Sequence, residues 1–389
     1  MRVKLKDIFD LQMGKTPSRS NLEYWNTTDY KWISIADLTK TSKYIFETKE
    51  YLSKSAIKDS GIKVIPANTV VMSFKLSIGK TAITKDDMYS NEAIMAFKDK
   101  HVINILPEYI FYLFKYKNWE EGSNKAVMGK TLNKATLSEI EVEICSIEKQ
   151  RQIVSILDKI MSSVDGRKQE LQLLDELIKA RFVEMFGDPV ANDKGWKMKP
   201  LLDMGKCKNG MNFHYDDSGV EISCLGVGDF KDLSVIDNTK KLSIVSLNEM
   251  PSEEYLLKDG DIVFVRSNGN KDLVGRSLAI YPGKLPTTFS GFCIRYRIHD
   301  DEITVPYLLR VLKMESMRKK MAGRGANIQN LNQQILGTLV IPVPPIELQN
   351  QFVDFVRAID KSKFDTMTFA PIYDIINLYL HTHFYQGRR

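Results

Sequence analysis

The chain contains a long internal repeat, and this repeat limits its fold more than any other feature of the sequence. Residues 131–160 align without a gap with residues 330–359, and nine of the thirty positions are identical. Roughly two identities are expected by chance. The identical pairs are Leu132/Leu331, Asn133/Asn332, Leu137/Leu336, Ile147/Ile346, Glu148/Glu347, Gln150/Gln349, Gln152/Gln351, Val154/Val353 and Ile160/Ile359. A separation of 199 residues indicates a duplicated domain and not a solenoid of short repeats.

Weaker similarities lie upstream in the same order. They join residues 5–14 to 201–210, residues 78–83 to 274–280, and the segments that begin at Pro107 and Pro306. Each copy therefore consists of a globular part followed by a helical part. We expect two similar globular domains, 1–145 and 191–344, each followed by a helical spacer, 146–190 and 345–389.

The globular parts are predicted to be α+β, with irregular sheets and long loops. Short apolar runs bounded by turn-forming residues predict strands over 32–35, 70–74, 93–97, 261–265 and 292–298. Segments 107–117 and 306–320 are predicted to be helices with proline in the first turn. Glycine and proline between 186 and 196 mark the end of the first helical spacer.

The helical spacers carry apolar residues at alternating spacings of four and three, which is typical of a heptad seam. In the first spacer these are Ile153, Leu157, Ile160, Val164, Leu171, Leu174, Ile178 and Met185. Arg167 and Arg181 interrupt the seam, and Gly166 leaves open whether the helix continues, bends or breaks. Pro371 divides the second spacer into two predicted helices, 347–362 and 370–385. Pairing of the two spacers would cover both seams.

Composition narrows the possible functions only a little. The 389 residues are 43% hydrophobic and 27% charged, as expected of a folded chain. No apolar run approaches the roughly 20 residues that span a bilayer, and the start lacks the apolar core of a signal peptide. We therefore expect a cytoplasmic protein with no membrane partner. A net charge of +6 permits nucleic-acid binding, but the charge is spread along the chain and would have to be assembled by folding.

Motifs for nucleotide chemistry are incomplete. The triplet Gly-Lys-Thr occurs at 14–16, 79–81 and 129–131, but a P-loop needs a further glycine five residues earlier. Those positions hold Phe9, Phe74 and Asn124. No glycine fingerprint of a dinucleotide site precedes a helix, and no Asn-Pro-Pro-Tyr/Phe segment is present. We therefore expect no cofactor and no catalysis by this chain.

Metal and thiol chemistry also lack a convincing pattern. Cys145, Cys207, Cys224 and Cys293 are far apart, which favours reduced and mostly buried thiols. His381 and His383 would lie on different faces of a helix, so no metal site is expected there. Asp37, Glu47 and Lys49 have a loose nuclease-like spacing, and a cryptic metal-dependent nuclease remains an alternative.

Several segments together resemble one family. They are residues 5–9 with 14–19, Tyr24 and Trp25, residues 32–37, residues 77–83, the junction 181–189 and the boundary 339–349. These resemble the specificity subunits of type I restriction–modification systems over nearly the whole chain. Two local departures are Ser146, where the second copy has Pro345, and the interruption at Pro371.

The resemblance implies a non-catalytic subunit that recognises DNA. Each domain would read one half of a split site on double-stranded DNA. The two helical spacers would pack antiparallel as a coiled coil, giving a pseudo-twofold molecule and setting the spacing between half-sites. The partners implied are two methyltransferase subunits, joined by translocating nuclease subunits in the full complex. A helical scaffold that binds no DNA is a further alternative.

Polar residues of the glycine-bearing loops are the candidates for DNA contact, because phosphates and base edges are read mostly by such side chains. In the first domain these are Lys15, Thr16, Ser18, Arg19, Lys75, Ser77 and Lys80. In the second they are Asn209, Asn212, His214, Arg266, Asn268, Asn270, Lys271, Arg276, Arg324, Asn327 and Gln329. Trp25, Trp32, Trp196 and Tyr215 either stack on DNA or, as we favour, pack at the rim of the core.

Glu148, Gln150, Glu347 and Gln349 are retained at the start of both helical spacers. One interpretation is that they cap the helix and form hinge hydrogen bonds. The other is that they dock two identical methyltransferase subunits, since a repeated surface suits a repeated partner.

Overall fold

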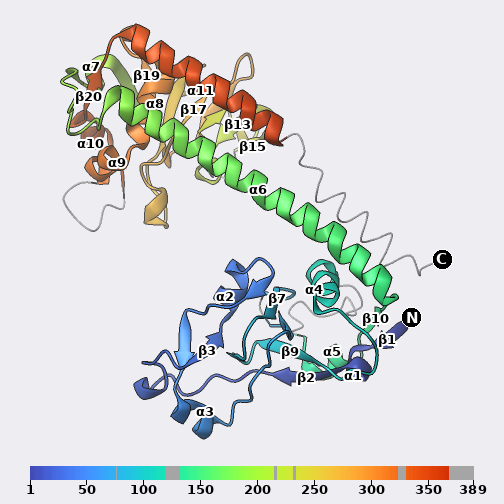
Figure 1. Ribbon diagram of the computed structural model, residues 1–389. Coiled ribbons are helices and arrows are strands. Elements are labelled where there is room, and N and C mark those ends of the chain that lie inside the picture. Colours follow the sequence, from blue (N-terminus) through green and yellow to red (C-terminus); the bar gives the residue numbers. More distant parts are fainter. Residues whose placement is uncertain (76, 120–131, 214–216, 231–233, 323–329, 368–389) are drawn as a thin grey trace. The chain divides into compact units, whose positions relative to one another are not determined.

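The computed structural model describes residues 1–75, 77–119, 132–213, 217–230, 234–322 and 330–367 (Figure 1). These residues divide into two compact units, Met1–Gln169 and Glu170–Met367. Within the described ranges, no helix combines the length and the apolar character needed to cross a bilayer. The helix predicted over 370–385, with His381 and His383, lies outside them, as does the triplet at 129–131.

The first unit is built from three small sheets. The largest has the order β2 (Phe9–Met13), β9 (Ile94–Asp99), β6 (Val70–Ser73), β7 (Thr81–Thr84) and β4 (Tyr44–Ile45). The second has the order β5 (Glu50–Leu52), β3 (Tyr30–Ile33) and β8 (Tyr89–Ser90), and β1 (Arg2–Lys4) pairs with β10 (Glu141–Glu143). The short helices are α1 (Leu5–Ile8), η1 (Leu22–Tyr24), α2 (Ile35–Lys40), α3 (Lys54–Ser60), α4 (Pro107–Tyr116) and α5 (Lys134–Ser138).

The second unit repeats this topology sheet by sheet. Its largest sheet has the order β12 (Gly205–Asn209), β19 (Cys293–Ile298), β16 (Asp261–Val265), β17 (Ser277–Ile280) and β14 (Val235–Ile236). The smaller sheets are β15 (Ser243–Leu247), β13 (Val220–Leu225) and β18 (Thr287–Phe289), and β11 (Lys197–Pro200) with β20 (Val340–Val343). Because the strand orders correspond one to one, the predicted duplication of an α+β domain is confirmed.

The helices of the second unit are α7 (Leu201–Met204), η2 (Val227–Asp229), η3 (Thr239–Lys241), η4 (Glu253–Tyr255), η5 (Lys271–Leu273), α8 (Val305–Lys313), α9 (Glu315–Ala322) and α10 (Gln333–Gly337). They correspond only in part, since α7, α8 and α10 stand where α1, α4 and α5 stand in the first unit. The single helix predicted over 306–320 is wrong, because Met314 has an extended backbone and separates α8 from α9. The break lets Met317 and Met321 of α9 enter the core.

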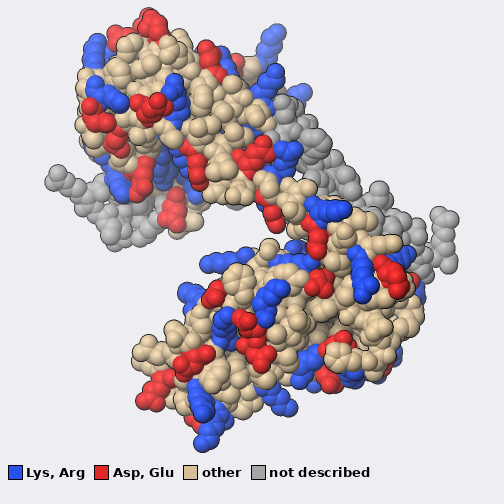
Figure 2. Space-filling view, in the orientation of Figure 1, with Lys and Arg blue, Asp and Glu red and all other residues tan. Residues whose placement is uncertain are grey.

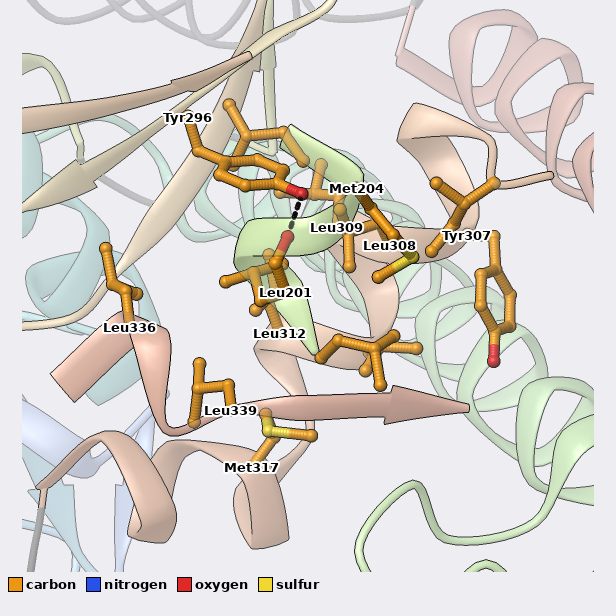
Figure 3. Close-up of a cluster of buried hydrophobic side chains, with 14 of the residues drawn as sticks. Leu201, Met204, Tyr296, Tyr307, Leu308, Leu309, Leu312, Met317, Leu336 and Leu339 are labelled. Atoms are coloured by element: carbon orange, nitrogen blue, oxygen red, sulfur yellow. Dashed lines mark hydrogen bonds between the residues drawn. The ribbon is translucent and has the colours of Figure 1, made fainter. Parts of the chain in front are cut away.

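A cluster of buried side chains holds α7, α8, α9 and the largest sheet together in the second unit (Figure 3). Leu308 and Leu312 of α8 are fully buried there, and complete burial of one leucine stabilises a fold by about 1.5–3 kcal/mol. The hydroxyl of Tyr296 donates to the carbonyl oxygen of Leu201 at 2.7 Å (Figure 3). This bond satisfies a polar atom that would otherwise be costly in an apolar core.

Helix α6 (Ile147–Phe186) continues without a break through Gly166. Its forty residues correspond to a length of about 60 Å at 1.5 Å per residue. Gly187 follows in a left-handed conformation, at φ +76°, and its N–H donates to the carbonyl of Val183 at 2.8 Å. The indole N–H of Trp196 donates to the carbonyl of Phe186 at 2.9 Å. The junction therefore ends the helix as the sequence predicted.

The first half of α6 packs against the core of the first unit. Ile153 and Leu157 are buried in the core formed by α4 and the largest sheet. Asp158 accepts hydrogen bonds from Lys43, at 2.6 Å, and from the hydroxyl of Tyr112. The seam predicted for helix pairing therefore serves partly to attach this helix to a domain.

The second half of α6 packs antiparallel against α11 (Ile346–Met367) (Figure 1). The ring centroids of Phe182 and Phe352 are 5.3 Å apart near one end of the pair. Lys363 and Asp175 form an ion pair of 2.6 Å farther along it. Arg181, which the heptad pattern placed in the seam, lies at its edge with the guanidinium 6.0 Å from the centre of the Phe355 ring.

Candidate nucleic-acid interface

The loop after β2 carries four of the candidate residues of the first unit, Lys15, Thr16, Ser18 and Arg19. It begins at Gly14, where a Cβ atom would lie 2.3 Å from the carbonyl oxygen of Ser90 and 2.2 Å from that of Asn91. The N–H of Lys15 donates to the carbonyl of Ser90 at 2.8 Å. Only glycine permits this close approach, so the loop is held tightly against the turn that follows β8.

Two tryptophans fix the same loop. The indole N–H of Trp32 donates to the carbonyl of Lys15 at 3.1 Å, and that of Trp25 donates to the carbonyl of Ser18 at 3.0 Å. Their rings meet edge to face with centroids 4.9 Å apart. These contacts agree with the packing interpretation of the two residues, since both indole donors are used within the protein.

The side chains of this loop are already engaged with the protein. The guanidinium of Arg19 lies 3.7 Å from the centre of the Trp25 ring and pairs with both carboxylate oxygens of Glu50. Lys15 donates to the carbonyl of Ser60, and the hydroxyls of Ser18 and Ser20 are 2.8 Å apart. The loop is therefore pre-organised, and few side-chain rotations would have to be frozen on binding.

The loop between β6 and β7, residues 74–80, carries Lys75, Ser77 and Lys80. The hydroxyl of Ser73 accepts the N–H of Lys80 at 3.0 Å, and it donates to the carbonyl of Ser77. The ammonium of Lys80 donates to the hydroxyl of Thr39 at 2.5 Å. Gly79 has a φ of +89°, which an L-residue rarely adopts.

The first of these loops contacts Glu92, a residue that the sequence had not singled out. The hydroxyl of Thr16 donates to its carboxylate, and this bond is the main cause that lowers the pKa of Glu92. The positive charges of Lys75 and Arg19 lower that pKa further, while partial burial opposes the shift. Thr16 therefore contacts the Glu92 carboxylate directly, and the charges of Lys75 and Arg19 favour its ionised form.

The second unit repeats this arrangement of two loops, which we call the loop platform. A Cβ at Gly210 would lie 2.1 Å from the carbonyl oxygen of Ser290, which repeats the contact of Gly14 with Ser90. Arg266 donates to the carbonyl of Gly291 at 3.2 Å, and a Cβ at Gly291 would lie 2.0 Å from the amide oxygen of Asn212. Arg266 and Asn212 therefore meet at Gly291.

The β16–β17 loop, residues 266–276, is shaped by its own asparagines. The side-chain oxygen of Asn268 accepts the N–H of Asn270 at 2.7 Å, and that of Asn270 accepts the N–H of Asp272 at 3.0 Å. Such local bonds fold a loop into successive turns. Asn209, at the end of β12, accepts a bond of 3.3 Å from the amide of Gln333.

Several candidates of the second unit remain predictions. His214, Arg324, Asn327 and Gln329 lie outside the described residues, as does Tyr215, and only the backbone of Lys271 is described. Figure 2 shows Lys and Arg interspersed with Asp and Glu on the visible face of each unit, without a large block of one sign. An interface on this face would therefore rely on particular local groups rather than on a large patch of one charge.

Gln150 and Gln349 form a joint between each globular part and its helix. Gln150 is fully buried, and its amide group donates to the carbonyls of Asn104 and Cys145 at 3.1 and 3.0 Å. Gln349 is also fully buried and donates to the carbonyls of Glu302 and Pro344 at 2.8 and 2.9 Å.

The expectation that these two glutamines dock a partner is therefore corrected. A fully buried side chain has no surface to offer a partner, and the hydrogen-bonding interpretation describes both residues. Glu148 and Glu347, two residues earlier in each copy, are exposed, so their docking role stays a prediction.

The nuclease alternative finds no support at Asp37. One carboxylate oxygen of Asp37 accepts the N–H and the hydroxyl of Ser34, at 2.8 and 2.7 Å, and so caps α2. The other oxygen accepts the N–H of Lys49 at 3.1 Å. Among the described residues, no group of three or more His, Cys, Asp or Glu side chains is arranged to hold a metal ion.

Comparison with known proteins gives one consistent family. A family model described as the type I restriction modification DNA specificity domain matches residues 1–176 and 193–371. The type I restriction enzyme MjaIX specificity subunit of Methanocaldococcus jannaschii is 28% identical over 54% of this chain and 52% of its own length. The StySPI specificity subunit of Salmonella potsdam is 24% identical over 84% of this chain and 74% of its own length. The match thus spans about half of the former relative and about three-quarters of the latter.

Solved structures show the same fold. The S subunit of a type I restriction–modification system from M. genitalium aligns over 99% of this chain and 96% of its own, with a TM-score of 0.52 and 14% identity. A chain solved in a study of complex assembly and conformational transition of the type I R-M system aligns over 98% and 96%, with a TM-score of 0.62 and 15% identity.

Proposed function

Because the chain belongs to the type I restriction modification DNA specificity family, we propose that each of its two units reads one half of a bipartite DNA sequence. The chain itself performs no chemistry. A methyltransferase subunit supplies the methyl transfer, and a translocating nuclease subunit joins the complex for cleavage. Since the substrate is the cell's own or invading DNA, the complex works in the cytoplasm.

The single observation that carries this proposal is the repeated loop platform. In each unit a glycine after the first strand of the largest sheet, Gly14 or Gly210, presses one loop against the carbonyl of an equivalent serine. A second loop, between equivalent strands, ends on Gly79 or Gly275, both with positive φ. Two copies of one platform with different loop side chains suit the reading of two different short sequences.

The proposal includes the contacts that read the DNA. In the first unit Lys15, Thr16, Ser18, Arg19, Lys75, Ser77 and Lys80 line the two loops. In the second unit the candidates are Asn209 at the end of β12 and the loop residues Asn212, Arg266, Asn268, Asn270 and Arg276. His214, Lys271, Arg324, Asn327 and Gln329 are further candidates. Arginine and asparagine form the strongest two-pronged contacts with guanine and adenine edges.

The proposal further assigns two methyltransferase subunits to the chain, one for each copy of the helix start. Glu148 and Glu347 are exposed at equivalent places and present the same carboxylate twice. A repeated surface of this kind suits two identical partners.

The test is methylation of a random DNA library by the chain together with its methyltransferase subunit, read by sequencing. We expect one split motif with a fixed spacer, and no methylation by either protein alone. Asn268→Ala with Asn270→Ala should relax or change only one half of the motif, and Lys75→Ala should affect only the other half. A continuous motif, or loop variants that alter both halves alike, would contradict the proposal.

A further inference from the structure

An exposed aromatic side chain, Phe292, lies between the two loops of the loop platform in the second unit. It follows Gly291, where a Cβ would lie 2.0 Å from the amide oxygen of Asn212 in the first loop. The carbonyl of Gly291 also accepts a bond of 3.2 Å from Arg266 of the second loop. The side chain of Phe292 is 61% exposed, which makes it the most exposed phenylalanine among the side chains that the structure describes.

The backbone of Phe292 is fixed by hydrogen bonds on both sides. Its carbonyl accepts the N–H of Arg266 at 2.8 Å and that of Ser267 at 3.4 Å. Its own N–H donates to the hydroxyl of Ser290 at 3.3 Å. The ring is therefore presented to solvent from a fixed backbone, and only its two side-chain torsions would have to be frozen on binding.

The first unit forms the same backbone contact without the ring. There the carbonyl of Ala93 accepts the N–H of Phe74, the first residue of the β6–β7 loop, at 3.0 Å. Phe292 accepts the N–H of Arg266, the first residue of the β16–β17 loop, in the same way. A small side chain is thus enough for this joint, so the needs of folding do not explain a phenylalanine at 292.

A single exposed apolar side chain is common on protein surfaces, so it is the location of Phe292 that matters. Its neighbours Arg266 and Asn212 have the groups that hydrogen-bond to base edges. Neither group forms a favourable contact with the apolar parts of a base, which are the C5-methyl group of thymine and the flat face of the ring. A phenyl ring packs well on both.

We propose that Phe292 packs against the apolar part of one base in the half-site that the second unit reads. This inference rests on the proposed DNA-recognition function and adds a specificity residue that has no polar group. The ring carries no charge, so its contact with DNA releases no counterions. Its loss should therefore lower the affinity without changing the salt dependence of binding, unlike the loss of a phosphate contact.

The test uses a fluorescent duplex that carries the split motif found by the methylation experiment. The chain is assembled with its methyltransferase subunit, and binding is titrated at several salt concentrations. Phe292→Ala should weaken binding about tenfold, with the slope of log affinity against log salt equal to that of the parent. Phe292→Tyr keeps the ring and should retain most of the affinity.

Phe46→Ala is the matched control, because Phe46 is also a well-exposed phenylalanine, at 58%. It follows Ile45, which pairs with Thr84 at the end of β7 that lies away from the β6–β7 loop. This variant should bind the duplex like the parent.

Modified bases distinguish the two kinds of apolar contact. If the ring touches a thymine methyl group, uracil at that position should weaken the parent and leave Phe292→Ala unaffected. If the ring stacks on a base face, 2-aminopurine at that position should change its fluorescence on binding of the parent but not of the variant. Absence of both signals at every position of the half-site would exclude the base contact.

Folding is checked by the urea midpoint, which Phe292→Ala should leave unchanged because the first unit has alanine in this joint. If Phe292→Ala binds as tightly as Phe46→Ala, the contact is wrong while the proposed function stands. A loss of affinity with a lower urea midpoint or a changed salt slope would indicate displaced loops, and it would also count against the contact. If methylation reveals no split motif, the proposed function itself fails.

Discussion

Gln150 accepts the backbone N–H of Leu106 on its amide oxygen at 2.9 Å, immediately before α4 begins. In the second unit Gln349 does the same for the N–H of Thr304 at 2.8 Å, immediately before α8. One buried amide therefore joins the segment just before a domain helix to the segment between the last strand and the spacer helix. The repeat retains glutamine here because no smaller or apolar side chain satisfies all three backbone groups.

Gln150→Leu should lower the free energy of unfolding of the chain by about 2–4 kcal/mol, because it leaves a buried N–H and two carbonyls without partners. Gln152→Leu is the matched control, since Gln152 is exposed on the same helix and is also retained in both copies. That variant should change stability by less than about 0.5 kcal/mol. Urea unfolding followed by circular dichroism measures both. Equal stability of the two variants would show that the joint is unimportant.

Glu148→Lys combined with Glu347→Lys should weaken association with the methyltransferase subunit and leave the urea midpoint nearly unchanged. Reversal of an exposed charge costs little in stability but opposes docking of a complementary surface. Size-exclusion chromatography of the mixed proteins measures the stoichiometry. The single variants should each lose one partner copy, and the double variant both. An unchanged complex with the double variant would place the docking surface elsewhere.

Gly210→Ala and Gly14→Ala should each destabilise the chain by about 1–3 kcal/mol, because the added methyl group would overlap a carbonyl oxygen of the neighbouring turn. Gly166→Ala provides a control of opposite sign. A Cβ at Gly166 meets nothing within 4 Å, and alanine in a helix interior is favoured by about 0.5–1 kcal/mol. Thermal unfolding of the three variants separates the two effects, and a stabilised Gly210→Ala chain would contradict the observed packing.

The duplication and the helical character of the first spacer could be predicted because their signals are local in the sequence. The nine identities fix the repeat, and the heptad spacing of residues such as Ile153 and Ile178 indicates a helix, although Gly166 left its continuity open. The residues that pack against each apolar position of this helix could not be predicted in the same way. Ile153 and Leu157 pack against a domain core, because a heptad pattern specifies an apolar face and not what covers it.

The sheets and the platform loops depend on contacts between distant residues. Strand β2 pairs with β9, and the parallel pairing of β4 with β7 joins residues about 40 positions apart. Thr16 reaches Glu92 only because distant strands pair in this way, so no local pattern indicated Glu92. The polar pair Asn91-Glu92 between two strands was the one available signal. The role of Gln150 likewise depends on its burial by distant segments. The sequence of one helix does not show whether a side chain is buried in this way.

The two units carry loops of different length between equivalent pairs of strands. The loop between β6 and β7 has seven residues, 74–80, and the loop between β16 and β17 has eleven, 266–276. Both return to the sheet through a glycine with positive φ. A doubling of loop length adds only about 0.6 kcal/mol to the free energy of loop closure, so these loops can change in length and sequence at a small cost in stability. A lineage can therefore acquire a new DNA target by exchanging a few surface residues, while the interior that folds the chain goes unaltered.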